Sequence, residues 1–380
     1  MSEENVMIKT EVVIVGAGPA GLGCAALLKQ MGIEDTELVV LEKGEIGQTF
    51  LQWPESMRFI TPSFPSNGYH QTDLNAITPD TSPAFSIGKE HLDGKEYAQY
   101  LSMVTQHYNI KVETNTCLKR VVNLADEDGF ELETESMTIR CIYLIWAGGE
   151  FHSPNLSAFR GAELCKHNSE ISQWNDLDNG EYLVIGGYES GVDAAYNLAN
   201  TGNKVTVLDF IGNDDTNTYD PSLVLSPYTA ERLANLSTRG NVELDDKFRV
   251  ESVVKGDNGY TVTSSCGKVI SSKFPPINCT GFDINLGPVS KLFDYQANGY
   301  PSINKFDESS KVSNLFLAGS RLYHDPTLLC FIYKFRGRFF APCSVIGEEL
   351  ALDMSILRHY KKSGMILNDL DCCVEQECFC

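Results

Sequence analysis

The N-terminal part of the chain places two short apolar runs on either side of a helical stretch. An apolar run from Glu11 to Val15 predicts a strand, and a Gly-rich turn follows it. Apolar positions at helical spacing continue to about Met31, and the run from Leu38 to Leu41 predicts a second strand. Strand, helix and strand in this order predict a βαβ unit with parallel strands.

A second unit of the same kind begins near Tyr182. There a predicted strand ends in the turn from Gly186 to Gly191, a helix continues to about Thr201, and a strand follows from Lys204 to Asp209. The repetition predicts an α/β protein with two Rossmann-like dinucleotide-binding domains, the second inserted into the first.

The segments around these two units have different patterns. Residues 45–94, roughly, are rich in Pro, Ser, Asn and aromatic residues and show neither a helical nor a strand-like spacing of apolar positions. A connection of this length is usually functional. A helix is predicted around residues 96–106 and strands through 111–145. A final strand at 315–318 is predicted to lead into a helical region that ends near residue 362.

The first turn carries a complete dinucleotide fingerprint, Gly16-Ala17-Gly18-Pro19-Ala20-Gly21. Gly16 permits a tight turn, Gly18 lets a pyrophosphate approach the helix N-terminus, and Gly21 lets the helix pack closely on the strand. Glu42 ends the next strand, where it can accept hydrogen bonds from ribose hydroxyls. A Gly-rich loop could also bind nothing, but the strand, helix and acid at the expected spacing favour a binding site.

The second turn keeps Gly186 and Gly191 but has Tyr188 at the middle glycine position. A side chain there crowds the path of a pyrophosphate, although the following helix N-terminus still favours nucleotide binding. Asp209 closes the next strand and would repel a 2′-phosphate. Any nicotinamide cofactor is therefore expected to be NADH in preference to NADPH.

The composition indicates an acidic, folded protein. Of 380 residues, 42% are hydrophobic and 21% are charged, which suits two or three packed domains. Thirty Lys and Arg against 51 Asp and Glu give a net charge of −21, which disfavours nucleic acid as a partner. No apolar run approaches the length of a membrane span, and residues 1–10 do not resemble a signal peptide. Most of the twelve Cys stand singly in apolar segments, which favours the cytoplasm.

In the order of its motifs the chain resembles, over nearly its whole length, the two-dinucleotide-binding-domain flavoproteins, the architecture of thioredoxin reductases and flavin monooxygenases. The resemblance implies that the first fingerprint binds FAD and that Ala147-Gly148-Gly149 marks the crossing to the pyridine-nucleotide domain. Thr280-Gly281 would mark the return. The late flavin motif, 315–319, normally ends in Gly-Asp, but Ser320 follows Gly319 and leaves no carboxylate at that position.

The resemblance also implies the domain boundaries. Residues 1–165 and 279–365 would form the two parts of the FAD domain, and residues 166–278 would form the NAD(P) domain. Residues 366–380 would be a Cys-rich tail.

Within this architecture the chain resembles the bacillithiol disulfide reductase-like proteins in its Glu42-Lys43-Gly44 and Trp53-Pro54 segments. That branch often has Cys after the Pro of the first fingerprint, where this chain has Ala20. The resemblance implies that the 48–85 insertion wraps the flavin, with FAD contacts from Gln48, Thr49 and Arg58. A surface loop packing its own aromatic residues would give the same pattern.

A flavin monooxygenase acting on a small heteroatom substrate is one alternative. Monooxygenases of this architecture carry Phe-x-Gly-x-x-x-His between their two domains, and Phe159-Arg160-Gly161 begins this signature. Cys165 stands where the His belongs, and His167 comes two residues late. Both departures count against a monooxygenase, and His167 is better explained as an ordinary linker residue.

Disulfide reductases of this architecture relay electrons through a Cys-x-x-Cys pair in the pyridine-nucleotide domain or a Cys-x-x-x-x-Cys pair in the first domain. Neither pair occurs in the corresponding domain of this chain. Cys330 is the internal candidate for a reactive thiol, because it follows the late flavin motif. Nearby Lys334, Arg336 and Arg338 could depress a thiol pKa or hold an anionic substrate. The alternative is a buried helix with paired charges and Cys330 as a core residue.

Four of the twelve Cys fall in the last nine residues, namely Cys372, Cys373, Cys378 and Cys380. These thiols could shuttle electrons from the flavin to an outside acceptor, hold a soft metal, or be inert on a disordered end. We favour the shuttle slightly.

Together these features predict an FAD-dependent enzyme that passes electrons from NADH through flavin to a low-molecular-weight disulfide or thiol-reactive acceptor. The expected partner is a small molecule, with no nucleic acid or membrane and a possible homo-oligomer. The alternatives are the flavin monooxygenase and a flavoprotein whose Cys tail binds a soft metal. No metal ligands are expected in the body of the chain.

Overall fold

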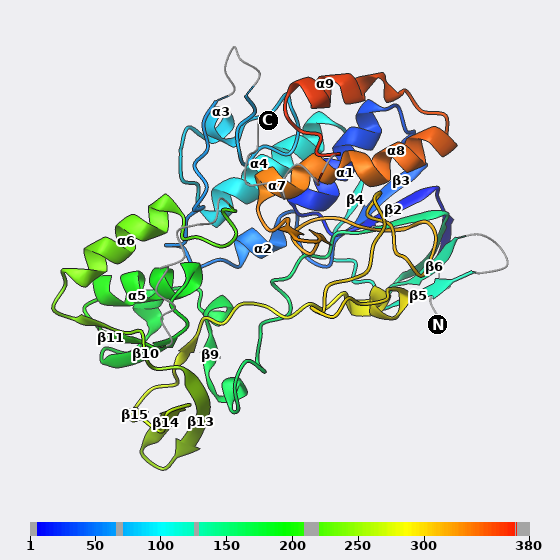
Figure 1. Ribbon diagram of the computed structural model, residues 1–380. Helices are drawn as coiled ribbons and strands as arrows, with labels where there is room; N and C mark the ends of the chain where they lie inside the picture. Colours follow the sequence, from blue (N-terminus) through cyan, green and yellow to red (C-terminus); the bar gives the residue numbers. More distant parts are fainter. Residues whose placement is uncertain (1–5, 66–70, 125–128, 209–219, 369, 371–380) are drawn as a thin grey trace. The chain divides into compact units, whose positions relative to one another are not determined.

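The computed structural model describes residues 6–65, 71–124, 129–208, 220–368 and 370 of the chain. The described residues form two compact units (Figure 1). The first unit draws on segments 1–51, 62–150 and 284–380, and the second on segments 52–61 and 151–283. The long inserted segment of the second unit thus begins at residue 151 and ends at 283, whereas the resemblance implies limits at 166 and 278.

The first unit contains two sheets and a small hairpin. Its strands are β1 (Val6–Lys9), β2 (Val12–Val15), β3 (Leu38–Leu41), β4 (Val112–Glu113), β5 (Arg120–Asn123), β6 (Phe130–Glu133), β7 (Met137–Cys141), β8 (Tyr143–Trp146), β17 (Leu315–Leu317), β18 (Tyr323–His324) and β19 (Thr327–Leu328). Its helices are α1 (Pro19–Gln30), α2 (Gln48–Leu51), α3 (Pro83–Ile87), α4 (Gly94–His107), α7 (Ile332–Phe335), α8 (Phe340–Glu349) and α9 (Leu357–Lys362).

A five-stranded parallel sheet in the order β17-β8-β2-β3-β4 forms the centre of the first unit. Every residue of β2, β3 and β8 is buried, as expected for parallel strands covered on both faces. Helix α1 packs on β2 and β3 and contacts α4 and α8 (Figure 1). The second sheet has the order β1-β7-β6-β5 and is mixed, because β1 runs parallel to β7 while the other pairs are antiparallel.

The predicted N-terminal βαβ unit is confirmed, and β3 has the predicted bounds. The helical region predicted after Gly319 is wrong in its first part, where β18 and β19 form a hairpin across Asp325 and Pro326. Pro has no backbone N–H for a helix and favours a turn. The 48–85 insertion contains α2 and α3, whose four and five residues are too few to show a helical period.

The second unit has its own parallel sheet in the order β12-β11-β10-β16-β9. Its core is formed mainly by side chains of β10, α5 and β11. A separate antiparallel sheet, β13-β14-β15, completes the unit. The elements are β9 (Lys166–His167), β10 (Glu181–Ile185), α5 (Glu189–Asn200), β11 (Lys204–Leu208), α6 (Pro227–Ser237), β12 (Val242–Asp245), β13 (Val250–Gly256), β14 (Gly259–Ser264), β15 (Val269–Ser272) and β16 (Ile277–Asn278).

A buried ion pair joins two distant segments of the first unit. Arg338 donates from Nε to Asp307 Oδ2 at 3.1 Å and from Nη2 to Asp307 Oδ1 at 2.9 Å. His324 Nε2 lies 2.6 Å from the same Oδ1. The Arg338 and Asp307 side chains are 2% and 0% exposed. Because water cannot reach the Asp307 carboxylate, Arg338 and His324 supply its hydrogen bonds. Among the described residues, no helix has both the length and the apolar character needed to cross a membrane.

We expect Arg338→Met to lower the free energy of unfolding by about 3–5 kcal/mol, because Asp307 would stay buried without its cation. Equilibrium urea unfolding followed by circular dichroism measures this change. Lys311→Met is the matched control, since Lys311 lies 3.7 Å from Asp294 in a surface pair, and such pairs contribute about 0–1 kcal/mol. Equal losses in the two variants would contradict the expectation.

Candidate functional site

The first glycine loop lies between the end of β2 and the start of α1, and two of its glycines are required by close backbone contacts. Gly16 has φ +109°, and a Cβ there would lie 2.4 Å from the carbonyl oxygen of Ala147. A Cβ on Gly21 would lie 1.9 Å from the carbonyl oxygen of Gly16. Only glycine fits at either position, as the fingerprint predicts.

Gly18 differs from these two glycines, because it faces open space. A Cβ on Gly18 would have no heavy atom of the described residues within 4 Å. Gly18 is the N-cap of α1, Pro19 and Ala20 open the first turn, and no described side chain caps this terminus. None of the described residues in the first turn of α1 is acidic. N–H groups that have no partner within the helix and the positive end of the helix dipole thus border an open space that suits a pyrophosphate.

Glu42 is held beside this loop. Its side chain is buried, with Oε2 accepting from the Ala17 N–H at 2.8 Å and Oε1 accepting from the Gly44 N–H at 2.9 Å. Each carboxylate oxygen keeps a second lone pair. The carboxylate is therefore fixed in place and can still accept hydrogen bonds from ribose hydroxyls.

The late flavin motif reaches the same place from the end of β17. Strand β17 pairs with β8, so that Leu317 lies opposite Trp146, and the chains continue into Gly319 and Ala147. Gly319 has φ +106°, and a Cβ there would lie 3.1 Å from the Cβ of Ala20. Position 148 must be glycine, because a Cβ there would lie 2.6 Å from the ring of Trp146. The carboxyl ends of β2, β8 and β17 therefore meet at the start of α1.

The four other residues predicted to contact FAD, from Lys43 to Arg58, are divided between the two units. Gln48 Oε1 accepts from the Glu45 N–H at 2.8 Å, Thr49 is half-buried, and Lys43 is exposed. Arg58 belongs to the second unit and donates from Nη1 to two carbonyl oxygens of its own loop. The structure thus keeps Lys43, Gln48 and Thr49 in the unit of the glycine loop and places Arg58 in the other.

The second glycine turn repeats the backbone contacts of the first. Gly186 has φ +99°, and its Cβ would lie 2.6 Å from the carbonyl oxygen of Cys279. A Cβ on Gly191 would lie 1.8 Å from the carbonyl oxygen of Gly186. Both glycines therefore have the roles that the motif predicts, as Gly16 and Gly21 do in the first unit.

The helix terminus of the second turn differs from that of the first. Tyr188 is the N-cap of α5, and its hydroxyl donates to the Ser222 carbonyl oxygen at 3.4 Å. Glu189 lies in the first turn and accepts from the Ser226 N–H at 2.6 Å and from the hydroxyl of Thr229. An acidic side chain in this position is unfavourable for a bound phosphate. Asp209 lies outside the described residues.

The residues of the incomplete monooxygenase signature are structural. His167 is fully buried, with Nδ1 2.7 Å from Ser169 Oγ and Nε2 3.0 Å from the Gly281 carbonyl oxygen. Burial lowers the pKa of His167, which keeps the ring neutral. Burial also raises the pKa of Cys165 to about 12, so this thiol stays protonated near neutral pH.

The arginines near Cys330 point into the fold. Arg338 pairs with Asp307, and Arg336 is buried and donates to the Ala76 carbonyl oxygen at 2.8 Å. Of the two interpretations of these arginines, the structure fits the one with buried, paired charges. Cys330 is half-buried and lies two residues before α7. Cys372, Cys373, Cys378 and Cys380 lie outside the described residues, and no group placed to hold a metal ion occurs among those described.

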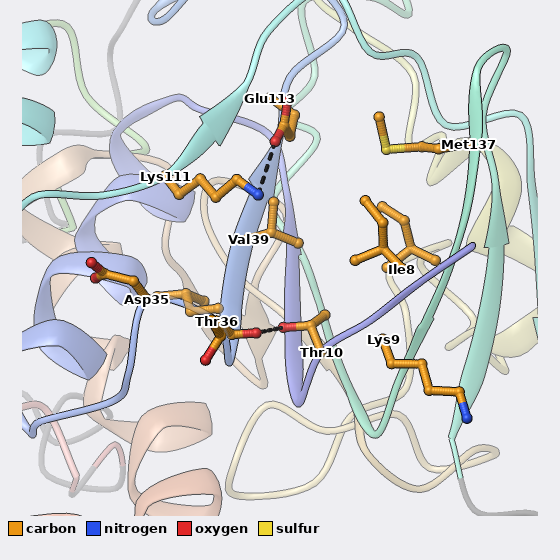
Figure 2. Close-up of a pocket in the computed structure, with 11 residues that line it drawn as sticks. Ile8, Lys9, Thr10, Asp35, Thr36, Val39, Lys111, Glu113 and Met137 are labelled. Carbon is orange, nitrogen blue, oxygen red and sulfur yellow. Dashed lines mark hydrogen bonds and ion pairs between the residues drawn. The ribbon is translucent and has the colours of Figure 1, made fainter. Parts of the chain in front are cut away.

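A hollow of about 220 Å³, shown in close-up in Figure 2, is lined by none of the residues from Gly16 to Gly21. Residues of β1, β3, β4 and β7 line it together with Thr10 and Thr36, which precede β2 and β3. Lys111 Nζ lies 3.1 Å from Glu113 Oε1, and the Thr10 hydroxyl donates to the Thr36 carbonyl oxygen at 3.2 Å. These polar groups bond to one another, so we assign the hollow no ligand.

Known proteins resemble the chain in both sequence and fold. Bacilliredoxin reductase Bdr of Bacillus subtilis (strain 168) is 28% identical over 321 residues, which cover 82% of this chain and 90% of that protein. The structure of bacillithiol disulfide reductase Bdr from Staphylococcus aureus matches with a TM-score of 0.74 at 20% identity, over 90% of this chain and 99% of that one. Thioredoxin reductase from T. acidophilum matches with a TM-score of 0.60 at 17% identity, over 90% and 99%.

These matches confirm the predicted α/β class and the resemblance to two-domain flavoproteins. The family model described as pyridine nucleotide-disulphide oxidoreductase covers residues 13–319, most of the chain. Its proteins are enzymes that use FAD and a pyridine nucleotide. By this match, the chain belongs to the pyridine nucleotide-disulphide oxidoreductase family.

Proposed function

We propose that the protein passes electrons from NADH through FAD to a low-molecular-weight disulfide or related thiol-reactive acceptor. The observation that carries this proposal is the open space at Gly18, next to the uncapped start of α1. Glu42 and the late flavin motif lie beside it, so one place offers groups for a phosphate and for hydroxyls. The printed names of the Bdr relatives support the choice of a thiol or disulfide acceptor.

Each candidate contact has a separate task in this proposal. The backbone from Gly16 to Gly21 would bind the pyrophosphate of FAD, and Glu42 would bind the adenosine ribose. The Ala147 carbonyl lies against Gly16, and Gly319 lies against Ala20, so the backbone stays close to the start of α1. Gly148 leaves room for the ring of Trp146. FAD supplies the group that accepts hydride from the nucleotide and passes electrons on. The turn from Gly186 to Gly191 would bind the nucleotide in the second unit.

The Cys tail is the proposed link to the acceptor. Two tail thiols would reduce a substrate disulfide to two thiols and close a disulfide between themselves, and two electrons taken from the nucleotide would restore them. Cys330 is the internal candidate for the same exchange. We do not propose a flavin monooxygenase, because Cys165 is at the position of the signature His and His167 is held in buried hydrogen bonds.

The cofactor site is tested by Gly18→Val. Gly18 has φ −87° and ψ −173°, which any residue adopts, so the variant should fold while its side chain occupies the pyrophosphate space. We expect it to purify without flavin, measured as absorbance near 450 nm. Gly240→Val is the matched control, because a Cβ at Gly240 also meets no described heavy atom within 4 Å. Full FAD content in Gly18→Val would show that the FAD site is misassigned.

Nucleotide choice is tested by anaerobic reduction of the FAD-loaded protein. NADH should bleach the flavin with a kcat/KM about tens- to several hundred-fold above that of NADPH, because a carboxylate at Asp209 binds the free ribose and repels a 2′-phosphate. Asp209→Gly should lower the ratio of the kcat/KM for NADH to that for NADPH. A wild-type preference for NADPH would contradict the assignment of Asp209, and no reduction by either nucleotide would contradict the proposed enzyme.

The tail is tested by deleting residues 371–380. The shuttle predicts unchanged flavin reduction by NADH and loss of turnover with an external disulfide, because only the exchange step uses the tail. Stopped-flow absorbance and steady-state thiol release measure the two steps separately. Full turnover by the truncated enzyme would contradict the shuttle. Stoichiometric soft metal on the intact protein would favour the metal-binding alternative.

A further inference from the structure

Ser320 follows Gly319 at the position where the late flavin motif has an aspartate, yet a carboxylate lies beside it. Glu150 Oε2 accepts from the Ser320 hydroxyl at 3.3 Å. The same oxygen lies 3.2 Å from Arg321 Nη1. A carboxylate from another part of the chain is therefore anchored next to the position that lost one.

The backbone explains how this carboxylate reaches Ser320. Strands β8 and β17 are hydrogen-bonded neighbours, and they end in register with Trp146 opposite Leu317. The two chains leave the sheet side by side, and Glu150 comes four residues after Trp146. Gly149 has φ +67°, a left-handed conformation that glycine adopts without strain, in the turn that leads to Glu150.

Only one oxygen of Glu150 is used in this anchoring. Oε2 takes both the hydroxyl and the guanidinium contact, whereas Oε1 makes no hydrogen bond with any residue that the structure describes. The Glu150 side chain is 37% exposed and that of Arg321 is 10% exposed. The nearly buried Arg321 therefore anchors the Glu150 carboxylate, which is itself partly accessible. A carboxylate has about four acceptor positions, so Oε1 retains its full capacity.

The position of this acceptor points to FAD. Gly319, directly before Ser320, packs against Ala20 in the first turn of α1, where the pyrophosphate space begins. Beyond its pyrophosphate FAD carries the ribityl chain, whose neutral hydroxyls donate hydrogen bonds. A carboxylate suits such hydroxyls, and the Arg321 charge reduces its repulsion of the phosphates.

We propose that Glu150 replaces the missing motif aspartate and accepts a hydrogen bond from a ribityl hydroxyl of FAD, with Ser320 and Arg321 as positioning residues. The inference rests on the proposed FAD site. The sequence alone could not identify Glu150, because it lies 170 positions from Ser320 and in no part of the motif.

The first test is FAD affinity, measured by flavin fluorescence when the apoprotein is titrated with FAD. Glu150→Ala should raise the Kd about 10- to 100-fold, the range expected for one hydrogen bond to a charged group. Glu150→Gln keeps the size and loses the charge, and its Kd should rise about tenfold. Glu34→Ala is the control, since Glu34 is exposed and its side chain makes no hydrogen bond with a described residue. Its Kd should stay within about twofold of wild type.

The second test is rescue. Ser320→Asp in the Glu150→Ala background returns a carboxylate to the motif position and should restore the Kd to within about threefold of wild type. The melting temperature of the apoprotein is measured beside the Kd, because Glu150→Ala also removes the contact with Arg321. If Glu150 had a purely structural role, Ser320→Asp would not restore the Kd.

The outcomes separate this inference from the proposed function. A wild-type apoprotein that takes up no FAD would overturn the proposed function. A wild type that binds FAD, with Glu150→Ala binding it equally well or with no rescue by Ser320→Asp, would overturn only the role of Glu150.

Discussion

The close contact between the Gly16 turn and the Ala147 carbonyl is the constraint on which the first unit depends. The 2.4 Å between this oxygen and an ideal Cβ on Gly16 leaves room for hydrogen alone. Because the contact is so close, the ends of β2 and β8 meet where α1 begins, and Gly21 brings the helix equally close. Any side chain at these positions would separate the helix start from the strand ends.

This constraint explains why part of the site was predictable from sequence. The β2, β3 and α1 segments are buried and apolar, and their glycines have local roles that the spacing reveals. The Arg338–Asp307 pair and Glu150 were not predictable, because each depends on a partner far away in the chain. The β18–β19 hairpin was missed because its strands have two residues each, too few to show alternation.

The two glycine turns share their backbone geometry but not their chemistry. Gly16 and Gly186 make equivalent contacts, whereas Gly18 faces open space and Tyr188 takes the corresponding place. Glu189 adds negative charge to the start of α5, which costs an anion about 0.3–1 kcal/mol in binding. Under the proposed assignment, the second turn would hold a nucleotide that leaves after each hydride transfer, and the open first turn would hold a cofactor that stays.

The acidic composition restricts how phosphates can be held. With 51 acidic against 30 basic residues, and with Arg336 and Arg338 buried, the proposed FAD site would hold phosphates through backbone N–H groups and the dipole of α1. Carboxylates then serve neutral hydroxyls, as Glu42 can for a ribose. In the proposed site, backbone N–H groups would therefore bind the phosphates of FAD and acidic side chains would bind its hydroxyls. In such a site the position of each glycine matters more than the position of any lysine or arginine.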